Sequence, residues 1–327
     1  MAEFKRLPDE TYQDYFVRLF ENKALYKLDC NKIAELLNAE NGQSYGESCY
    51  RKEWQSFNRG RLYERELIER GVKTRILCIS DIHFPFAKPI ETFCDYVGRV
   101  DILLLNGDIL DCAAISKFIK MYRTSPIEEM IGARQYLIDL IEYIQPKQVI
   151  ATYGNHDSRL GAYLAKNLDT DIQELLPETA LDYLFLDGFT HYDRKLRTKT
   201  HYDPICEVFE DIKVEYVGNW HCQVGDVIFC HPKAFASNPM KTAEKAMYFF
   251  RNEGKQFKAL VMAHTHRVGD YKIGNTKIYE QGAACETNKM NYNDGMLTNS
   301  QKQGFAYICL DKDGNNMEDK TKVITLN

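Results

Sequence analysis

The 327-residue sequence contains no apolar run that approaches the ~20 residues needed to cross a bilayer as a helix. Its first ten residues, MAEFKRLPDE, also lack the basic-then-apolar pattern of a secretory signal peptide. We therefore expect a cytoplasmic protein that does not bind membranes, and the sequence leaves its oligomeric state open.

The ten cysteines include no CxxC pair, so we do not expect a structural zinc knot. In a cytoplasmic protein the thiols are expected to be reduced, and several lie in apolar runs where a small buried side chain fits. An excess of positive charge is also missing, because 42 basic residues stand against 47 acidic ones and the net charge is −5. Such a protein does not coat a polyanion with its whole surface, so contact with DNA would need a local basic patch.

Residues 1–72 are predicted to form a polar, all-helical module. Apolar residues recur at helical intervals around residues 10–28, 31–40 and 45–70, with an Asn41-Gly42 turn before the third segment. Three helices around a short turn favour a helix-turn-helix-like module. The third segment holds four basic residues against one acidic residue between positions 51 and 61, and these are the candidates for nucleic-acid contact: Arg51, Lys52, Arg59 and Arg61. A solvated helical face explains these charges more simply than contact with DNA, which stays the alternative.

From Arg75 onward the pattern changes to short apolar runs separated by helical segments. Residues 127–144, IEEMIGARQYLIDLIEYI, carry one apolar helical stripe between two of these runs. Buried strands alternating with helices predict an α/β domain over residues 73–327, a layered α+β sandwich with mixed sheets flanked by helices. Residues 158–222 are less regular, and we expect a helical, cap-like insertion there. The runs are ILCIS (76–80), ILLLN (102–106), VIATY (149–153), VIFC (227–230) and ALVMA (259–263).

Each of the five apolar runs ends in a polar cluster rich in aspartate and histidine. In open α/β sheets, ligands bind in the crevice beyond the carboxyl ends of the strands. Five clusters at such positions predict one shared site along a single edge. The clusters are Asp81-Ile82-His83, Gly107-Asp108 with Asp111, Gly154-Asn155-His156-Asp157, His231, and His264-Thr265-His266.

These residue types indicate a divalent metal centre. Carboxylates and imidazoles together suit first-row metals such as Mn, Fe or Zn, whereas Mg and Ca prefer oxygen ligands. Asp81 and His83 are two residues apart, so on an extended backbone their side chains project to one side and can hold a single ion. His264 and His266 repeat this spacing. Because one carboxylate can bridge two ions ~3.5–4 Å apart, so many ligands favour a pair of ions over one.

The ordered motifs DIH, GDILD, GNHD, CHP and AHTH resemble those of the calcineurin-like metallophosphoesterase superfamily, over roughly residues 75–285. The resemblance implies two divalent ions, Mn²⁺ foremost with Fe, Zn, Ni or Co as alternatives, and attack on phosphorus by a hydroxide that bridges them. It implies one ion held by Asp81, His83, Asp108 and His266, and a second held by Asp108, Asn155, His231 and His264.

The resemblance gives His156 a role other than that of a ligand. It would stabilise the transition state or protonate the leaving group, oriented by Asp111, and an imidazolium paired with a carboxylate would keep the proton that both roles need. Cys112 stands where the protein phosphatase branch has an arginine that binds phosphate, and Ala263 replaces the usual glycine of the last motif. Arg159 can supply the missing positive charge, although a solvated helix residue is an equal alternative.

The function expected from this pattern is that of a phosphodiesterase or nuclease acting on nucleic acid or nucleotides. Both the GNHD and the HxH motifs resemble that branch more closely than the protein phosphatases, and a helical module at the N-terminus favours such a substrate. One alternative is a phosphomonoesterase for small molecules or phosphoproteins. The other is a DNA-binding protein that uses the second domain as a scaffold. The pairing of the two domains resembles chains encoded by phages or prophages.

Overall fold

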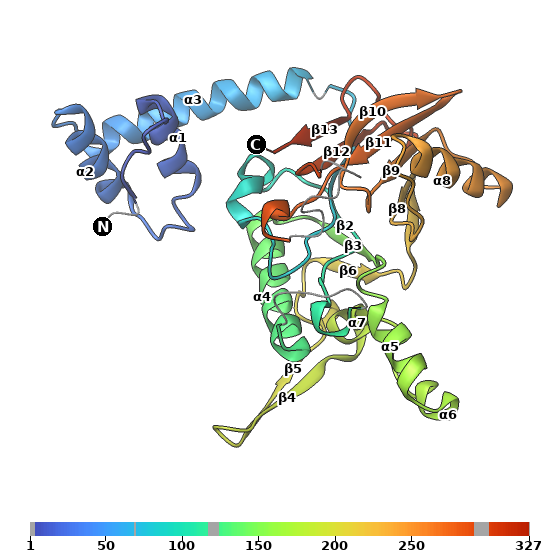
Figure 1. Cartoon of the computed structure of the whole chain (residues 1–327). Coiled ribbons are helices and arrows are strands. Elements are labelled where there is room, and N and C mark those ends of the chain that lie inside the picture. The colour runs from blue at the N-terminus through green and yellow to red at the C-terminus, as the bar shows by residue number, and fades with distance from the viewer. Residues whose placement is uncertain (1–3, 69, 117–123, 291–300, 327) are drawn as a thin grey trace. The chain divides into compact units, whose positions relative to one another are not determined.

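The computed structural model describes residues 4–68, 70–116, 124–290 and 301–326. The chain divides into two compact units, Met1–Arg70 and Gly71–Asn327 (Figure 1). The first is helical and the second is a mixed α/β structure, which confirms the predicted fold class. Among the described helices, none is both long and apolar enough to cross a membrane.

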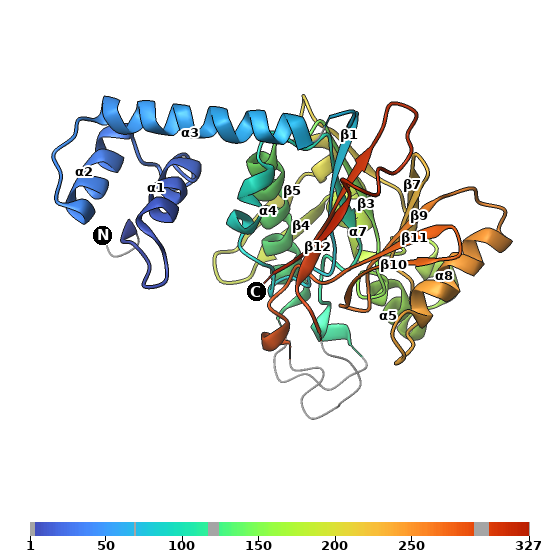
Figure 2. The ribbon, with the colours of Figure 1, turned by 90° about the horizontal axis from the view of Figure 1, so that it is seen from above.

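The first unit consists of α1 (Tyr12–Glu21), α2 (Cys30–Asn41) and the long α3 (Glu47–Ile68) (Figure 2). Thr11 begins α1 with a capping box, in which its hydroxyl accepts from the Asp14 N–H and the Asp14 carboxylate accepts from the Thr11 N–H. Gly42 ends α2 at a φ of 70°, a conformation that favours glycine. The three helices enclose a separate apolar core of Tyr15, Phe16, Leu19, Phe20, Ile33, Ala34, Leu37 and Tyr50.

Two sheets form the centre of the second unit, with strand orders β13-β12-β1-β2-β3-β6 and β10-β11-β9-β8-β7. In the first, β1, β2, β3 and β6 are parallel, whereas β12 and β13 run antiparallel to their neighbours. In the second, β8, β9 and β11 are parallel, and β7 and β10 are antiparallel edge strands. Both sheets are therefore mixed, as expected. The strands are β1 (Thr74–Ile79), β2 (Ile102–Asn106), β3 (Gln148–Thr152), β6 (Lys213–Tyr216), β7 (His221–Val224), β8 (Val227–Cys230), β9 (Ala259–Met262), β10 (Val268–Ile273), β11 (Thr276–Gln281), β12 (Gly304–Leu310) and β13 (Lys322–Thr325).

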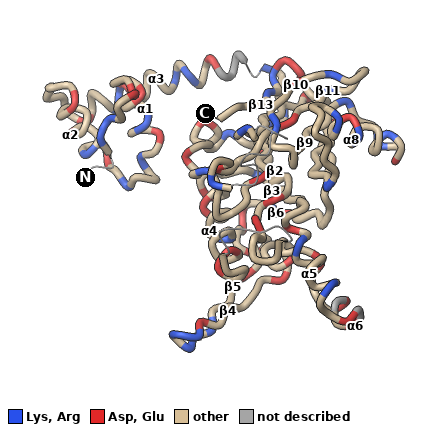
Figure 3. The backbone as a smooth tube through the Cα atoms, viewed as in Figure 1, with Lys and Arg blue, Asp and Glu red and all other residues tan. Residues whose placement is uncertain are grey.

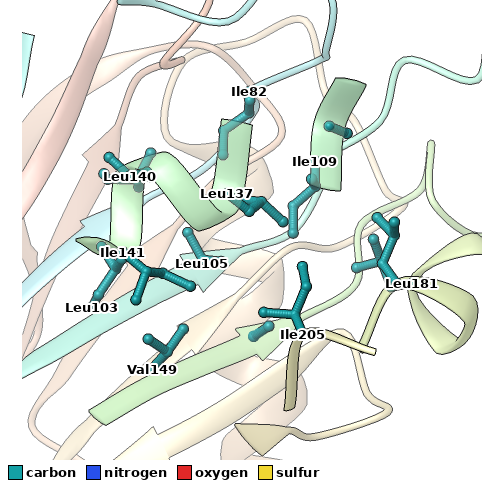
Figure 4. Packing of buried hydrophobic residues seen from close by; sticks show 14 of the residues in the cluster. Ile82, Leu103, Leu105, Ile109, Leu137, Leu140, Ile141, Val149, Leu181 and Ile205 are labelled. Atoms are coloured by element: carbon teal, nitrogen blue, oxygen red, sulfur yellow. The ribbon is translucent and has the colours of Figure 1, made fainter. Parts of the chain in front are cut away.

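Alternating side chains of the central strands separate the interior into layers. Leu77 and Leu103 face a core shared with α4 (Pro126–Ile144), whereas Ile76 and Ile102 face the second sheet. The far side of the second sheet packs on α8 (Lys241–Asn252). The layers are thus helix, sheet, sheet, helix, with the packing under α4 shown in Figure 4. Burying both faces of parallel strands explains why their sequences are continuous apolar runs.

The segment expected to be a helical insertion is only partly helical. It contains α5 (Arg159–Asn167), α6 (Thr170–Gln173), α7 (Ala180–Asp182), a two-stranded hairpin of β4 (Phe189–Asp193) and β5 (Thr198–Tyr202), and then β6. The β6 strand belongs to the main sheet beside β3. The hairpin projects from the body of the unit with lysine and arginine at its tip (Figure 3). Short helical turns complete the unit: Ile90–Tyr96, Ala113–Ile115, Tyr183–Asp187, Ile205–Glu207 and Thr287–Lys289.

Candidate metal centre

The loops after β1, β2, β3, β8 and β9 bring aspartate and histidine side chains together at one edge of the two sheets. Within the described residues they form three overlapping groups whose ligand atoms all lie within 4.8 Å of one another. All of these side chains except the half-buried His264 are buried. The groups are Asp81-His83-His266, His83-Asp108-His156 and Asp108-His231-His264.

Asp81 holds one part of the centre together. Its Oδ2 accepts hydrogen bonds from the Ser80 hydroxyl at 2.6 Å and the His264 backbone N–H at 3.2 Å. Its Oδ1 faces the other way, 3.0 Å from Nε2 of His266 and 3.7 Å from Nε2 of His83. The two imidazole Nε2 atoms are themselves 3.2 Å apart. Three potential metal-ligand atoms therefore converge on one point, as expected for a cation site.

Asp108 connects this group with the next one. Its Oδ1 accepts from the His156 backbone N–H at 2.7 Å, which fixes the carboxylate. Its Oδ2 lies 3.1 Å from Nε2 of His231 and 3.8 Å from Nε2 of His83. A single oxygen thus faces histidines from both groups.

The second group contains potential metal-ligand atoms that have no hydrogen-bond partner in the described part of the chain. His231 donates from Nδ1 to the carbonyl of Asn106 at 2.8 Å, which directs Nε2 into the centre. Oδ1 of Asn155 and Nε2 of His264 are buried and have no hydrogen-bond partner among the described residues. Buried polar atoms left in this way are rare in native proteins and often mark an ion site. The residues present therefore fit divalent cations.

The pKa values of the buried side chains show that the carboxylates of the centre are stabilised by nearby positive charge. Burial opposes ionisation of Asp81, but His231 and His266 lower its pKa well below the ordinary value. Burial also opposes a charge on His231, yet Asp108 and Asp81 raise its pKa to about 10. Protons on histidine thus balance the buried carboxylates, and a divalent cation would displace these protons.

The backbone at the centre adopts conformations that L-residues rarely occupy. Ten non-glycine residues of the described chain have positive φ, and five of them are predicted ligands. Such conformations cost about 1–3 kcal/mol each and persist where the surroundings enforce them. The five are Asp81 (φ 51°), His83 (45°), Asp108 (51°), His264 (78°) and His266 (51°).

Asp157 organises the loop that carries Asp108. Its fully buried carboxylate accepts four backbone hydrogen bonds, from Asp108 (2.8 Å), Ile109 (3.1 Å), Leu110 (3.1 Å) and Gly154 (2.8 Å). Burial and the neighbouring Asp108 raise the pKa of Asp157 to about 7, against the N–H groups that favour its ionised form. Gly154 is required here, since a Cβ at this position would lie 2.1 Å from Oδ1 of Asp108.

His156 lies beside the centre with Asp111 and Arg159. Its Nδ1 is 3.0 Å from the carbonyl oxygen of Asp111 and 3.1 Å from Oδ1 of the same residue. Arg159 donates from Nη1 to the Asp111 carbonyl at 2.7 Å and from Nη2 to Nε2 of His156 at 2.8 Å. Burial, and then His83 and Arg159, lower the pKa of His156 to about 4 despite the opposing carboxylates of Asp108 and Asp111. This shift and the Arg159 N–H that donates to Nε2 both favour a neutral imidazole, whereas the resemblance implied an imidazolium.

The basic residues of α3 have different environments. Arg51 pairs with Glu47 at 3.2 Å, and Lys52 and Arg59 are exposed. Arg61 is half-buried, where it forms an ion pair with Glu21 and lies over the Trp54 ring at 5.7 Å. Its guanidinium is thus used inside the first unit.

Several contributions to the centre have no motif of their own. The Asn106 carbonyl, the Ser80 hydroxyl and the four N–H groups bound by Asp157 act through the backbone or through a small side chain. The only signal for them in the sequence is their position, because each belongs to a predicted ligand or lies within two residues of one.

Comparison with known families matches the profile described as calcineurin-like phosphoesterase to residues 74–268. The matched range covers more than half of the chain and ends just after the last histidine of the centre. The chain belongs to the calcineurin-like phosphoesterase family. It is accordingly a metal-dependent hydrolase of phosphate esters, as expected from the motifs.

The first unit is similar to a different family. Residues 1–68 match the profile described as YonJ N-terminal domain. Over 65 residues the chain is 44% identical to the SPbeta prophage-derived protein YonJ of Bacillus subtilis strain 168. That match covers 20% of this chain and 16% of the length of YonJ, so it concerns the helical unit alone.

Solved structures similar to the chain share little sequence with it. Vacuolar Protein Sorting 29 from Cryptosporidium parvum is 12% identical with a TM-score of 0.37, covering 78% of this chain and 99% of that one. An archaeal phosphodiesterase is 17% identical with a TM-score of 0.31, covering 77% and 100% of the two chains.

Proposed function

We propose that this phosphoesterase is a dinuclear enzyme that hydrolyses phosphodiesters of nucleic acids or nucleotides. The observation that carries the dinuclear assignment is the placement of Asp108 Oδ2 between histidines of two groups. Asp81, His83 and His266 would hold one cation with Asp108, and Asn155, His231 and His264 would hold the other with it. Divalent cations bound there supply Lewis acidity and a water of lowered pKa as nucleophile, with Mn²⁺ the first choice for this mixture of oxygen and nitrogen ligands.

The residues beside the centre would act on the phosphate. Arg159 supplies a fixed positive charge, because two hydrogen bonds to Asp111 and His156 hold its guanidinium. A guanidinium matches two phosphate oxygens at once and would neutralise charge that develops on them. This compensates for Cys112, which occupies the position of the phosphate-binding arginine in the protein phosphatase branch. His156, whose two ring nitrogens contact Asp111 and Arg159, would hold the guanidinium of Arg159 in place for the phosphate.

Hydrolysis of simple aryl esters tests this function directly. The protein loaded with Mn²⁺ is expected to cleave methyl p-nitrophenyl phosphate, a diester, faster than p-nitrophenyl phosphate, a monoester. Asp108→Asn serves as the control, since it removes the shared carboxylate charge and should abolish both activities. A preference for the monoester would replace the diester proposal, and no turnover by protein shown to hold two cations per chain would overturn the function.

We also propose that α3 contacts nucleic acid through Arg51, Lys52 and Arg59. Support comes from their basic character and their exposure, whereas Arg61 is committed to Glu21. A gel-shift titration of the full chain at two salt concentrations tests this proposal. Binding should weaken at higher salt and in a Lys52→Ala/Arg59→Ala variant. Equal binding by the variant and the parent would contradict it.

Nuclease activity that survives removal of residues 1–70 would place the chemistry in the second unit alone.

A further inference from the structure

A pocket of about 530 Å³ lies between the loops after β3 and β8, which carry predicted ligands, and the helix α8. Pro232 in its wall follows the predicted ligand His231 directly, and Tyr153 lies two residues before Asn155. Successive Cα atoms are about 3.8 Å apart, so these wall residues lie within about 4–7 Å of the ligands, measured between Cα atoms. Two walls of the pocket thus belong to the loops that would carry the cations. It is lined by Tyr153, Trp220, Pro232, Lys233, Ala234, Thr242, Lys245, Ala246 and Phe249.

Three aromatic residues, Tyr153, Trp220 and Phe249, line this pocket. Trp220 is half-buried and stacks on Phe250 with ring centroids 5.3 Å apart. The Trp220 carbonyl accepts from the His231 N–H at 2.8 Å, which ties the ring's backbone to that of a predicted ligand. Phe249, on α8, is 46% exposed although it is a large apolar side chain beside Trp220, with ring centroids 5.6 Å apart. An aromatic surface so placed is available to a planar ligand.

Two lysines give the same pocket a positive charge. Lys233 and Lys245 are both exposed and line the pocket. Lys241, one turn before Lys245 on α8, pairs with Glu244 at 2.5 Å. In contrast, neither Lys233 nor Lys245 has a carboxylate partner among the described residues. An anionic ligand would supply the missing counter-charge.

We propose that this pocket binds the nucleobase of a nucleotide whose phosphodiester is cleaved at the metal centre. The inference rests on the proposed function and deepens it. The base would pack against the aromatic side chains of Trp220, Tyr153 and Phe249, as bases stack on aromatic residues in proteins that bind single strands. The lysines would contact the adjoining phosphates. Stacking tolerates any base, so the pocket would distinguish nucleotides from other esters without reading sequence.

Tryptophan fluorescence measures binding to the pocket without any catalysis. The chain has two tryptophans, so a Trp54→Phe variant leaves Trp220 as the single reporter. In EDTA, adenosine 5′-monophosphate is expected to quench this emission in a saturable manner. Ribose 5-phosphate, which lacks the base, should produce no quenching at ten-fold higher concentration. Quenching by ribose 5-phosphate or by phenyl phosphate at the same concentrations as adenosine 5′-monophosphate would overturn the nucleobase assignment.

Two pairs of variants on α8 locate the binding site. Phe249→Ala and Lys245→Ala should each weaken the affinity for adenosine 5′-monophosphate about ten-fold or more. Tyr248→Ala and Lys241→Ala are the matched controls, because these exposed neighbours do not line the pocket. Equal effects of both members of a pair would overturn the proposal.

A kinetic comparison separates the pocket from the chemistry. The ratio of kcat/KM for the p-nitrophenyl ester of thymidine 5′-monophosphate to that for methyl p-nitrophenyl phosphate should fall about ten-fold in Phe249→Ala and stay constant in Tyr248→Ala. If neither ester is cleaved but the quenching holds, the proposed function fails and the pocket stands. If both esters are cleaved at an unchanged ratio and no quenching occurs, the function stands and the pocket assignment fails.

Discussion

Arg159 donates a hydrogen bond of 2.8 Å from its guanidinium to Nε2 of His156, three residues earlier in the chain. A guanidinium is always a donor, so the imidazole accepts at Nε2 and carries its proton on Nδ1, toward Asp111. The positive charge on this side of the centre therefore belongs to Arg159 and not to the histidine.

Replacing Arg159 with alanine should lower kcat for methyl p-nitrophenyl phosphate about 10²–10³-fold, because the fixed charge on the phosphate oxygens is lost. The number of Mn²⁺ ions bound per chain should not change. Steady-state kinetics and metal analysis on the same sample measure the two quantities. Lys166→Ala, a basic residue elsewhere on α5, is the control. A kcat equal to that of the parent would show that Arg159 is only a structural partner of His156.

His156→Ala should retain both cations and lose most of the activity, by about 10²–10³-fold, because the guanidinium of Arg159 loses the acceptor that positions it. The cations should stay because Nε2 already accepts from Arg159, which leaves the ring outside the ligand set proposed here. Metal titration followed by calorimetry gives the stoichiometry, and hydrolysis of the same diester gives the rate. Loss of one cation per chain in this variant would instead make His156 a ligand.

Asp157→Asn should reduce metal affinity about 10–100-fold although the residue is not a ligand. In the parent, both carboxylate oxygens of Asp157 accept hydrogen bonds from backbone N–H groups. The asparagine amide would turn an NH₂ group toward some of these N–H groups, and because two donors repel each other, the Asp108 loop must shift. The free energy of unfolding should fall by about 2–4 kcal/mol. Chemical denaturation and cation titration test the two effects, with the exposed Asp187→Asn as the matched change. Unaltered affinity would mean that Asp108 does not depend on this carboxylate.

Glu129 should make stability fall as pH rises. Burial, and then the charge of Asp111, raise its pKa from 4.5 to about 7, while the Cys112 N–H opposes this shift at 2.6 Å. A carboxyl with a raised folded-state pKa contributes stability that is complete below about pH 4.5 and is lost as pH passes 7. The loss corresponds to about 3 kcal/mol. The fall in unfolding free energy between pH 5 and pH 8, measured by denaturation in EDTA, should be smaller by about this amount in Glu129→Gln than in the parent, because Asp157 and His231, with pKa values raised to about 7 and about 10, contribute a fall of the same sign in both proteins. An identical slope in both proteins would refute the assignment.

The sequence was sufficient to predict the five strands that precede the aspartate and histidine clusters, whereas β4, β5 and β6 lie in a segment that was expected to be helical. Continuous apolar runs such as ILLLN predict buried parallel strands, and such strands deliver Asp108 and its counterparts to one edge. Other features depend on contacts that no local pattern records. The lowered pKa of His156 follows from burial, and the pocket combines Phe249 of α8 with Trp220, which directly precedes β7. Such relationships arise only from tertiary packing.

The left-handed conformations of five predicted ligands link folding to cation supply. Without bound cations, backbone strain and buried polar atoms without partners both destabilise the native state, so the apoprotein should have the lowest free energy of unfolding. Cation binding would offset part of that cost, so the free energy of unfolding should rise with the logarithm of the free concentration of a divalent cation that binds there. Depletion of that cation would then reduce the amount of folded protein as well as its activity.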